Sequence, residues 1–475
     1  MLEARKFGFL LCEVAGAALW LVLALFVCPA AGIGTACMLA CIWIFVRLAS
    51  RVLHLDSDAE LWALLGAMTI LGILLILNTD FFLYHTGAGD GKPYLANHDS
   101  ARYWGFINAF IASRPVPSDT FVNYANLMTP LVKLFGLRGV LAFNTLCTML
   151  TICFTGRIAR ECSPHRGAEV SAVAIVMLTL AFNFMAHGSV LLKDALVVAS
   201  FSGTAAALLI LRNNDCRNHP WALTGAIAAC ISAIFVRSLS APMVLGLILM
   251  LMPWKGLLDA KQKRTVLTFC SLAVLSVALT IVLNAIMDNL IVHLSAGAIR
   301  TGNDVVFSTS QRGSSLSSFI NSYPLMPVWQ RIAALPLTMA LQMFLPLPWT
   351  YLRHIDYGPS MMLAHMGYPL YIEVGFVIYF FIFALRKAPR RLVTTAAAGL
   401  LFYMMIAYTY GGTVSRYALM LLPLLLPAGA WVVVNHLREH RLKLWMTAYI
   451  LLMAMSLGLG MYLYNLRPSG NDLLC

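Results

Sequence analysis

Apolar blocks of about 20 residues recur along the whole chain and constrain its fold more than any other feature. Lipid cannot hydrogen-bond free backbone N–H and C=O groups, so a block of this kind crosses a bilayer as an α-helix. Charged residues make up only 11% of the 475 positions, whereas a soluble domain carries about 25%. These features exclude soluble enzymes, secreted modules and disordered chains. They predict an all-α, polytopic membrane protein.

The apolar pattern predicts about 13 transmembrane helices. One further apolar block, 332–349, would start and end on the same side of the membrane and finishes in a proline-rich run. We expect a re-entrant or interfacial helix there, and amphipathic helices on the outer face. The predicted spans are 9–29, 33–48, 61–77, 140–155, 170–185, 195–211, 221–235, 241–252, 266–287, 368–385, 392–408, 418–435 and 444–464.

The basic residues indicate how the chain is oriented. Most of the 33 lysines and arginines lie in short loops that would share one side of the membrane, and the positive-inside rule assigns that side to the cytoplasm. We therefore expect a cytoplasmic N-terminus and an outer C-terminus. The net charge of +13 then reflects topology, and no finger, RNP or basic-helix pattern indicates a nucleic-acid partner.

On this topology the chain divides into five segments. Two of them are long outer loops, and loops of that length are usually functional or disordered. The segments are an N-terminal three-span part (1–78), an outer loop with amphipathic helices (79–139), central spans (140–287), a second outer loop with the re-entrant or interfacial helix (288–367) and a C-terminal four-span part (368–475).

The first outer loop carries the clearest candidate for acid–base chemistry. Asp99 and Ser100 precede an amphipathic stretch at 106–111, and both residue types can cap a helix by accepting hydrogen bonds from free N–H groups. The alternative role for Asp99 is that of a base that takes a proton from an acceptor hydroxyl at the membrane surface. Arg102 and Tyr103 follow within one helical turn.

Further polar residues lie at the predicted outer ends of spans. Lys193 and Asp194 begin a predicted helix, where the helix dipole favours an acidic side chain and the lysine can reach lipid headgroups. Arg237 lies between two short spans, and Arg416 and Tyr417 open a proline-bent span. A guanidinium binds phosphate through paired donors, although an arginine at the interface can also act as a plain lipid anchor.

The sequence supports no metal or cofactor site. Glu373 lies inside a predicted span, and the preceding loop offers His354, Asp356 and His365, but their spacing matches no metal-ligand pattern. No P-loop, dinucleotide fingerprint or nucleophile elbow is present in the sequence. A divalent metal is chemically possible, but nothing in the pattern favours it.

Several short motifs follow one another in a fixed order between 99 and 435. They are Asp99-Ser100-x-x-Tyr103, a Tyr124 to Gly136 stretch around Pro130, Asn144, the run from Gly156 to Arg160, Lys193-Asp194-Ala195-Leu196, the segment from Phe344 to Trp349, and Ser415-Arg416-Tyr417. In this order and spacing the chain resembles membrane glycosyltransferases of the GT-C type. That resemblance implies an enzyme at the outer face of a bacterial inner membrane that takes a sugar from a polyprenyl-phosphate carrier.

The resemblance also implies roles for individual residues. Asp99 would act as the base or position the acceptor, and Arg416, with Arg237 or Lys193, would hold the carrier phosphate. The partners would be a polyprenyl-phosphate-linked sugar donor, a glycan, lipid or protein acceptor, and membrane lipids. Two alternatives remain open: a polymerase or ligase of the O-antigen type, which depends on arginines, and a flippase or transporter for lipid-linked sugar.

Overall fold

The computed structural model describes residues 2–27, 32–84, 98–116, 122–213, 220–236, 241–251, 328–344, 367–410 and 415–465. Within these ranges the chain is helical and contains no strand, as the sequence predicts. The helices up to the first large gap are α1 (Leu2–Val27), α2 (Gly32–Val52), α3 (Asp58–Tyr84), α4 (His98–Ile111), α5 (Val122–Phe135), α6 (Leu137–Cys162), α7 (Gly167–Leu180), α8 (Phe182–Gly188), α9 (Asp194–Asn213), α10 (Pro220–Val236) and α11 (Ala241–Leu251).

The C-terminal half adds shorter helices and two long ones. They are α16 (Val328–Ala333), α17 (Leu335–Phe344), α19 (Tyr368–Tyr379), which continues as the π-helical turn η6 (Phe380–Ala384), α20 (Arg390–Tyr410), α21 (Ser415–Leu419), α22 (Leu422–His436) and α23 (His440–Asn465).

Seven described helices are long and apolar enough to cross a membrane, and α7 with α8 would make an eighth span if the bent pair is counted as one. The seven are α1, α2, α3, α6, α9, α20 and α23. The chain is therefore a multi-pass membrane protein by the length and composition of its helices. The expected total of about 13 spans stays a prediction, and the predicted span 266–287 lies outside the described residues.

Three predicted elements differ in form from the structure. The span 170–185 is broken, because α7 and α8 meet at a bend of 71°. The span 418–435 begins as the short helix α21 and continues after a turn as α22. The block 332–349 starts as α16 and α17, which are short helices on either side of Ala334, and its proline-rich end lies outside the described residues.

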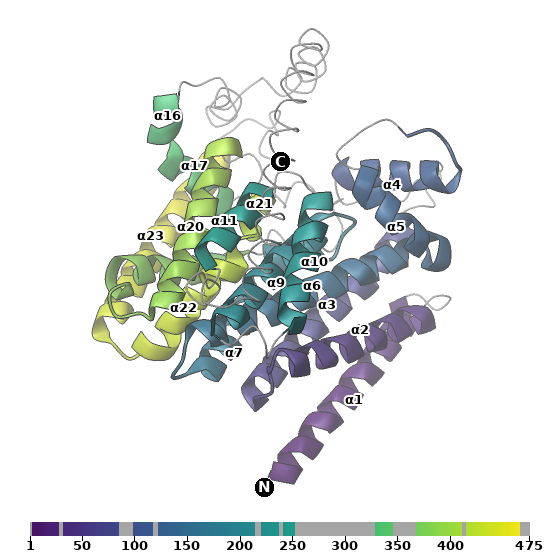
Figure 1. Ribbon diagram of the computed structural model, residues 1–475, viewed down its shortest axis with the longest axis horizontal. Helices are drawn as coiled ribbons and strands as arrows, with labels where there is room; N and C mark the ends of the chain where they lie inside the picture. Colours follow the sequence, from purple (N-terminus) through teal and green to yellow (C-terminus); the bar gives the residue numbers. More distant parts are fainter. Residues whose placement is uncertain are drawn as a thin grey trace, which may run out of the picture.

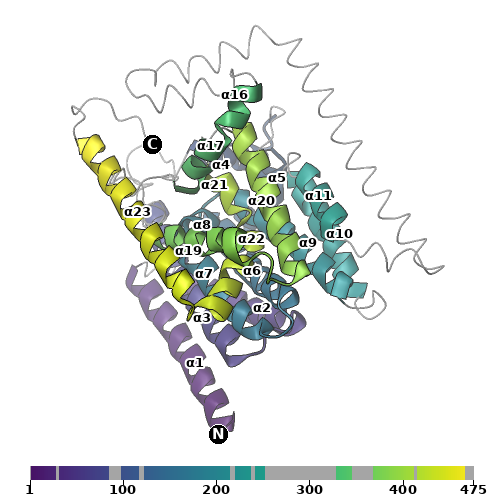
Figure 2. The same ribbon diagram turned by 90° about the vertical axis from the view of Figure 1, so that its left-hand side faces the viewer.

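Helices α6 and α9 form the centre of the bundle. Of the most apolar window of α9, 89% is buried, compared with 11% for α1 and 17% for α23. Figures 1 and 2 show α1 and α23 at the periphery, whereas α6 and α9 are surrounded by other helices. Four buried threonines of α6 donate hydrogen bonds to carbonyls one turn back in their own helix, so their hydroxyls cost little in the apolar interior. These are Thr145, Thr148, Thr151 and Thr155.

Two local signals explain where helices begin. Ser57 and Glu60 form a capping box at the start of α3: the Glu60 carboxylate accepts from the Ser57 backbone N–H at 3.1 Å, and the Ser57 hydroxyl accepts from the Glu60 N–H at 3.3 Å. Gly136 separates α5 from α6 with a φ of 65°, a left-handed conformation that glycine adopts without strain. The turn at Gly136 directs α6 away from α5 into the bundle.

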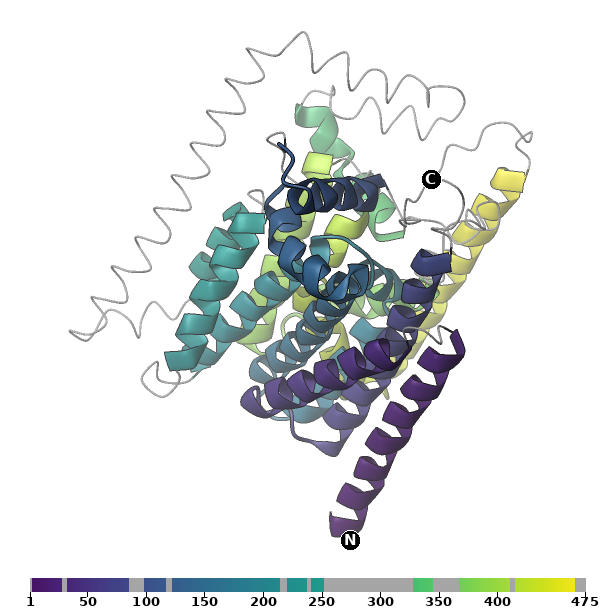
Figure 3. The ribbon, with the colours of Figure 1, turned by 90° about the vertical axis from the view of Figure 1, so that its right-hand side faces the viewer.

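Hydrogen bonds from two arginines show which segments lie together at one end of the bundle. Arg160 donates to the carbonyl of His54, and Arg166 donates to the carbonyl of Val434. The loop after α2, the end of α6 and the end of α22 therefore lie together, and we name this the arginine-rich end. Because α6 starts directly after α5 and runs to Arg160, α4 and α5 lie at the opposite end, which we name the α4–α5 end (Figure 3).

Candidate functional site

The chain leaves helical geometry inside the bundle between α8 and α9. Residues 189–193 form turns and bends, and Ser189, Val190, Leu191 and Leu192 are each at most 1% exposed. Buried backbone without helical hydrogen bonds needs other partners, most of all in a membrane protein, where no water in the bilayer core can supply them. The buried backbone groups of 189–193 therefore need hydrogen-bond partners from other parts of the fold.

Side chains from three other helices supply that support. Five consecutive carbonyls, from Gly188 to Leu192, each accept a hydrogen bond from a side chain of α3, α4 or α6. The bonds are Thr148 Oγ1 to Gly188 O at 3.1 Å, Asn78 Nδ2 to Ser189 O at 3.1 Å, Asn144 Nδ2 to Val190 O at 2.6 Å, Ser100 Oγ to Leu191 O at 2.9 Å, and Asn144 Nδ2 to Leu192 O at 3.0 Å. We name this set the carbonyl cradle. The Thr148 hydroxyl has one proton, which it shares between Gly188 O and Asn144 O.

Asn144 is the central residue of the carbonyl cradle. Its side chain is fully buried on α6, donates to two carbonyls, and accepts at 2.9 Å from the hydroxyl of Tyr124 on α5. Burial raises the pKa of Tyr124, with a smaller contribution in the same direction from the charge of Asp194. Tyr124 therefore keeps its proton and remains a donor to Asn144 at any physiological pH.

The cradle fixes the start of α4, where the sequence places Asp99. The Ser100 hydroxyl donates to Leu191, so the first turn of α4 lies on the segment that leads into Lys193 and Asp194. Ser100 therefore bonds a different part of the chain, and its predicted role as a helix cap stays a prediction. The backbone of Asp99 is part of α4, whereas its side chain lies outside the described residues.

Lys193 and Asp194 lie directly after the cradle. Asp194 is the first residue of α9 and is 6% exposed, as expected for an acidic residue at a helix start. Lys193 precedes it and is partly buried. Asn144 bonds both Leu192 and Tyr124, and Ser100 bonds Leu191, so the start of α9, the first part of α5 and the start of α4 lie together.

The remaining predicted residues have different surroundings. On α4, Arg102 is exposed, while Tyr103 is 1% exposed and packs edge-on against Tyr124 with ring centroids 5.0 Å apart. Tyr103 therefore contributes to packing, and its predicted contact with substrate stays a prediction. Arg237 lies outside the described residues, but the preceding helix α10 ends against α5, because Asn123 Nδ2 donates to the carbonyl of Phe235 at 2.9 Å.

Arg416 and Tyr417 belong to the short helix α21, which packs against α8 and α17. Tyr417 is partly buried, and the side chain of Arg416 lies outside the described residues. The backbone thus brings three separate elements to the break between α7 and α9: the start of α4 with Asp99, the start of α9 with Lys193, and α21.

Glu373 is a second polar feature of the interior. It is 5% exposed on α19, and neither carboxylate oxygen has a hydrogen-bond partner among the described residues. Its helix starts close to α8, since a Cβ on Gly367 would lie 2.9 Å from Asn183 Oδ1. The predicted neighbours 354, 356 and 365 lie outside the described residues, and the described part of the chain contains no group of three His, Cys, Asp or Glu side chains that could hold a metal ion.

Sequence reasoning missed most of the carbonyl cradle. It gave no role to Asn78, Thr148 or Ser189, and Asn144 entered only through the resemblance. The available signal was a set of polar side chains inside otherwise apolar helices, but their partners lie 40 to 111 residues away along the chain.

Comparisons of the chain with protein-family models, curated proteins and solved structures give no match.

Proposed function

We propose that the chain is a membrane glycosyltransferase that moves a sugar from a polyprenyl-phosphate carrier to an acceptor hydroxyl. The observation that carries the proposal is the bond from Ser100 to Leu191, which joins the helix start bearing Asp99 to the segment that leads into Lys193. A carboxylate and a cation carried on these two elements are the groups that a displacement at a sugar phosphate requires. The sequence-derived orientation assigns this α4–α5 end to the outer face of the membrane, and the resemblance to GT-C glycosyltransferases implies a bacterial inner membrane.

In the proposed reaction, Asp99 takes the proton of the acceptor hydroxyl while the hydroxyl oxygen attacks the anomeric carbon. The bond between that carbon and the phosphate oxygen breaks, and the polyprenyl phosphate leaves with both electrons. Lys193, with Arg416 or Arg237, neutralises the leaving phosphate, and fixed cations at such a site usually supply the largest share of transition-state stabilisation. The donor binds from the bilayer, because no nucleotide sugar is available on that face.

The carbonyl cradle gives this site its rigidity. Catalytic groups must stay close to their productive geometry, and a displacement of about 1 Å can cost about a hundredfold in rate. By satisfying five carbonyls of an irregular segment, the four donor side chains hold the start of α9 against the start of α4. We therefore assign them a positioning role and reserve direct contact with the substrate for Asp99 and the cations.

The test is a transfer assay with the purified chain in lipid vesicles and a panel of polyprenyl phosphates that carry radiolabelled hexoses. Asp99→Asn is expected to lower transfer by at least about a hundredfold, the usual contribution of a general base. Glu169→Gln is the matched control, because Glu169 is also an acidic residue in the first turn of a helix but lies beside Arg166 at the arginine-rich end. Full transfer by the folded Asp99→Asn protein would refute Asp99 as the base.

Two arginine variants, tested in the same transfer assay, distinguish the polymerase alternative from the proposed transferase. A polymerase or ligase of the O-antigen type would lose activity in Arg237→Gln and Arg416→Gln but retain it in Asp99→Asn. A transferase would lose it in Asp99→Asn as well.

A second candidate function is transport of lipid-linked sugar across the bilayer. Two observations favour it: the 71° bend between α7 and α8, since broken helices form the substrate sites of many transporters, and Glu373, since buried carboxylates in membrane bundles often carry protons. A flippase would move a fluorescent polyprenyl-linked sugar between leaflets with no acceptor present, and would do so equally well in Asp99→Asn.

A further inference from the structure

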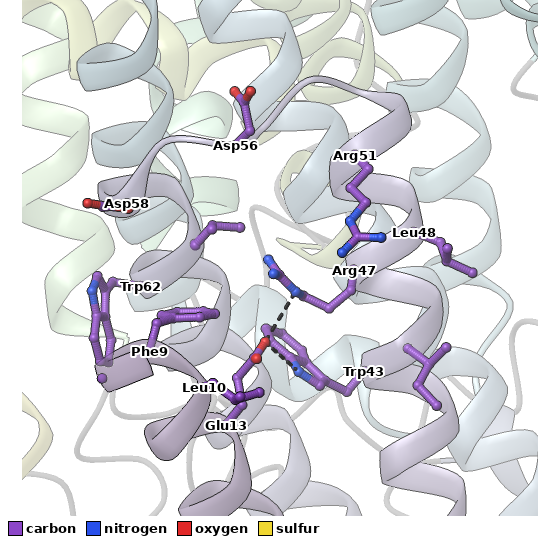
Figure 4. A pocket seen from close by; sticks show the side chains of 13 residues that line it. Phe9, Leu10, Glu13, Trp43, Arg47, Leu48, Arg51, Asp56, Asp58 and Trp62 are labelled. Carbon is purple, nitrogen blue, oxygen red and sulfur yellow. Dashed lines mark hydrogen bonds and ion pairs between the residues drawn. The ribbon is translucent and has the colours of Figure 1, made fainter. Parts of the chain in front are cut away.

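A pocket of about 1050 Å³ lies between the first three helices at the arginine-rich end. It is separate from the carbonyl cradle, which lies towards the other end of α3 and α6. Figure 4 shows that α2 supplies Arg47 and Arg51 on one side of the space, while α3 supplies Asp58 and Trp62 on the other. The pocket therefore combines cations, carboxylates and aromatic rings where the loop after α2 joins α3.

The arginine side of the pocket can bind an anion. Glu13 accepts from Arg47 Nε and from Trp43 Nε1, both at 3.1 Å, and the Arg47 guanidinium lies 5.3 Å from the ring centre of Phe9. These contacts fix the Arg47 side chain through one nitrogen. Arg51 is one turn further along α2, and its guanidinium has no partner within the ranges that the structure describes. Two neighbouring guanidinium groups suit one phosphate.

The opposite side of the pocket suits a cation. Asp58 forms no ion pair with any described residue, and it lies in the first turn of α3 next to Trp62, whose side chain is 47% exposed. Asp56 also lines the pocket but already pairs with Arg160 at 3.2 Å. A free carboxylate beside an exposed aromatic ring is the arrangement that attracts an ammonium group.

The walls towards the middle of the helices are apolar and open. Leu10, Ile44 and Leu48 line the pocket and are 55%, 58% and 51% exposed. Since α1 and α2 span the membrane, these side chains face acyl chains. A ligand of this pocket therefore has a charged head at the helix ends and an apolar body along the helices.

We propose that the pocket binds a zwitterionic phospholipid, of the phosphatidylethanolamine class, from the leaflet at the arginine-rich end. Its phosphodiester lies between Arg47 and Arg51, its ammonium lies beside Asp58 and Trp62, and its acyl chains follow the apolar wall. Charge complementarity selects this head. Phosphatidylglycerol carries the same phosphodiester but no ammonium, so it would leave the Asp58 carboxylate without a cation, and a free phosphate would not use the apolar wall.

The test is native mass spectrometry of the full chain in detergent, titrated with phosphatidylethanolamine, with phosphatidylglycerol of matched acyl chains, or with inorganic phosphate. We expect one retained phosphatidylethanolamine per chain. Arg51→Gln should weaken its binding about tenfold, as for the loss of one charge-assisted hydrogen bond. Arg438→Gln is the matched control, because Arg438 is also an exposed arginine at this end but lies outside the pocket.

Asp58→Asn provides a second, opposite readout. It should weaken phosphatidylethanolamine and strengthen phosphatidylglycerol, because it removes a negative charge but leaves the capping box of α3 in place. Equal binding by wild type, Arg51→Gln and Arg438→Gln would overturn the site. Wild-type preference for phosphatidylglycerol, or retention of inorganic phosphate alone, would overturn the assignment to a zwitterionic lipid.

Discussion

Replacement of Asn144 by leucine is the sharpest test of the carbonyl cradle. The two side chains share the same branched skeleton of four heavy atoms, so the substitution removes hydrogen bonds without opening a cavity. Asn144 makes three bonds, at 2.6, 3.0 and 2.9 Å, to Val190 O, Leu192 O and the hydroxyl of Tyr124. Val190 O retains the N–H of Leu192 at 2.8 Å, whereas Leu192 O and the Tyr124 hydroxyl lose the partner that Asn144 provides.

The size of the effect follows from those two orphaned groups. A buried polar group without its partner costs about 1–3 kcal/mol, so Asn144→Leu should lower the free energy of unfolding by about 2–6 kcal/mol. Hydrogen bonds in membrane proteins average about 0.6 kcal/mol, which favours the lower end of that range. Thr151→Val is the control on the same helix, because among the described residues its buried hydroxyl bonds only the carbonyl of Cys147 in α6 itself.

The assay is equilibrium unfolding in mixed micelles by titration with sodium dodecyl sulfate. The buried Cys153 and Cys162 report unfolding through maleimide labelling once exposed thiols such as Cys12 are blocked. Thr151→Val should change the free energy of unfolding by less than about 1 kcal/mol. If Asn144→Leu falls within about 0.5 kcal/mol of Thr151→Val, the cradle does not stabilise the fold as argued.

Two further predictions concern Gly188 in the carbonyl cradle and Glu439 at the arginine-rich end. Gly188→Ala should destabilise the chain by about 1–3 kcal/mol through overpacking, because its new Cβ would overlap the hydroxyl of Thr148, and Thr148→Ala should restore part of the loss in the same titration. At the end of α22, His436 Nδ1 lies 2.8 Å from Glu439 Oε1, and this hydrogen bond lowers the pKa of Glu439 below its ordinary 4.5. The ionised carboxylate therefore stabilises the fold above about pH 4.5 and stops doing so as the pH falls through the folded-state pKa. Thermal melts should show Glu439→Gln less stable than wild type near pH 7 and equal to it near pH 3, and a gap between the two that stays constant with pH would contradict this.

The sequence is sufficient to predict most of the helices that the structure describes. Spans 61–77, 140–155 and 195–211 correspond to α3, α6 and α9, because one continuous apolar run of the right length dictates each of them. The bend after Leu180 was not predicted, since hydropathy averages over a window and 170–185 is apolar on average. Asn183 and His187 are polar residues just beyond the bend, and they were the local signal for it.

The candidate site could be predicted only in part. The positions of Ser100 and Asp194 at helix starts follow from local chemistry. The bond from Ser100 to Leu191 joins residues 91 positions apart, and no local rule links them. The pairing of Glu13 with Arg47 spans two helices in the same way, so the lipid pocket also became visible only in three dimensions.

The position of a bound carrier phosphate tests the central claim most directly. We expect a cryo-electron microscopy map of the full chain with undecaprenyl phosphate to show the phosphate within hydrogen-bonding distance of Lys193, between the start of α4 and α21. The Asp99 carboxylate should face the phosphate oxygen to which a sugar would be attached. Phosphate density at the arginine-rich end alone, or an Asp99 carboxylate directed away from the phosphate, would contradict the account.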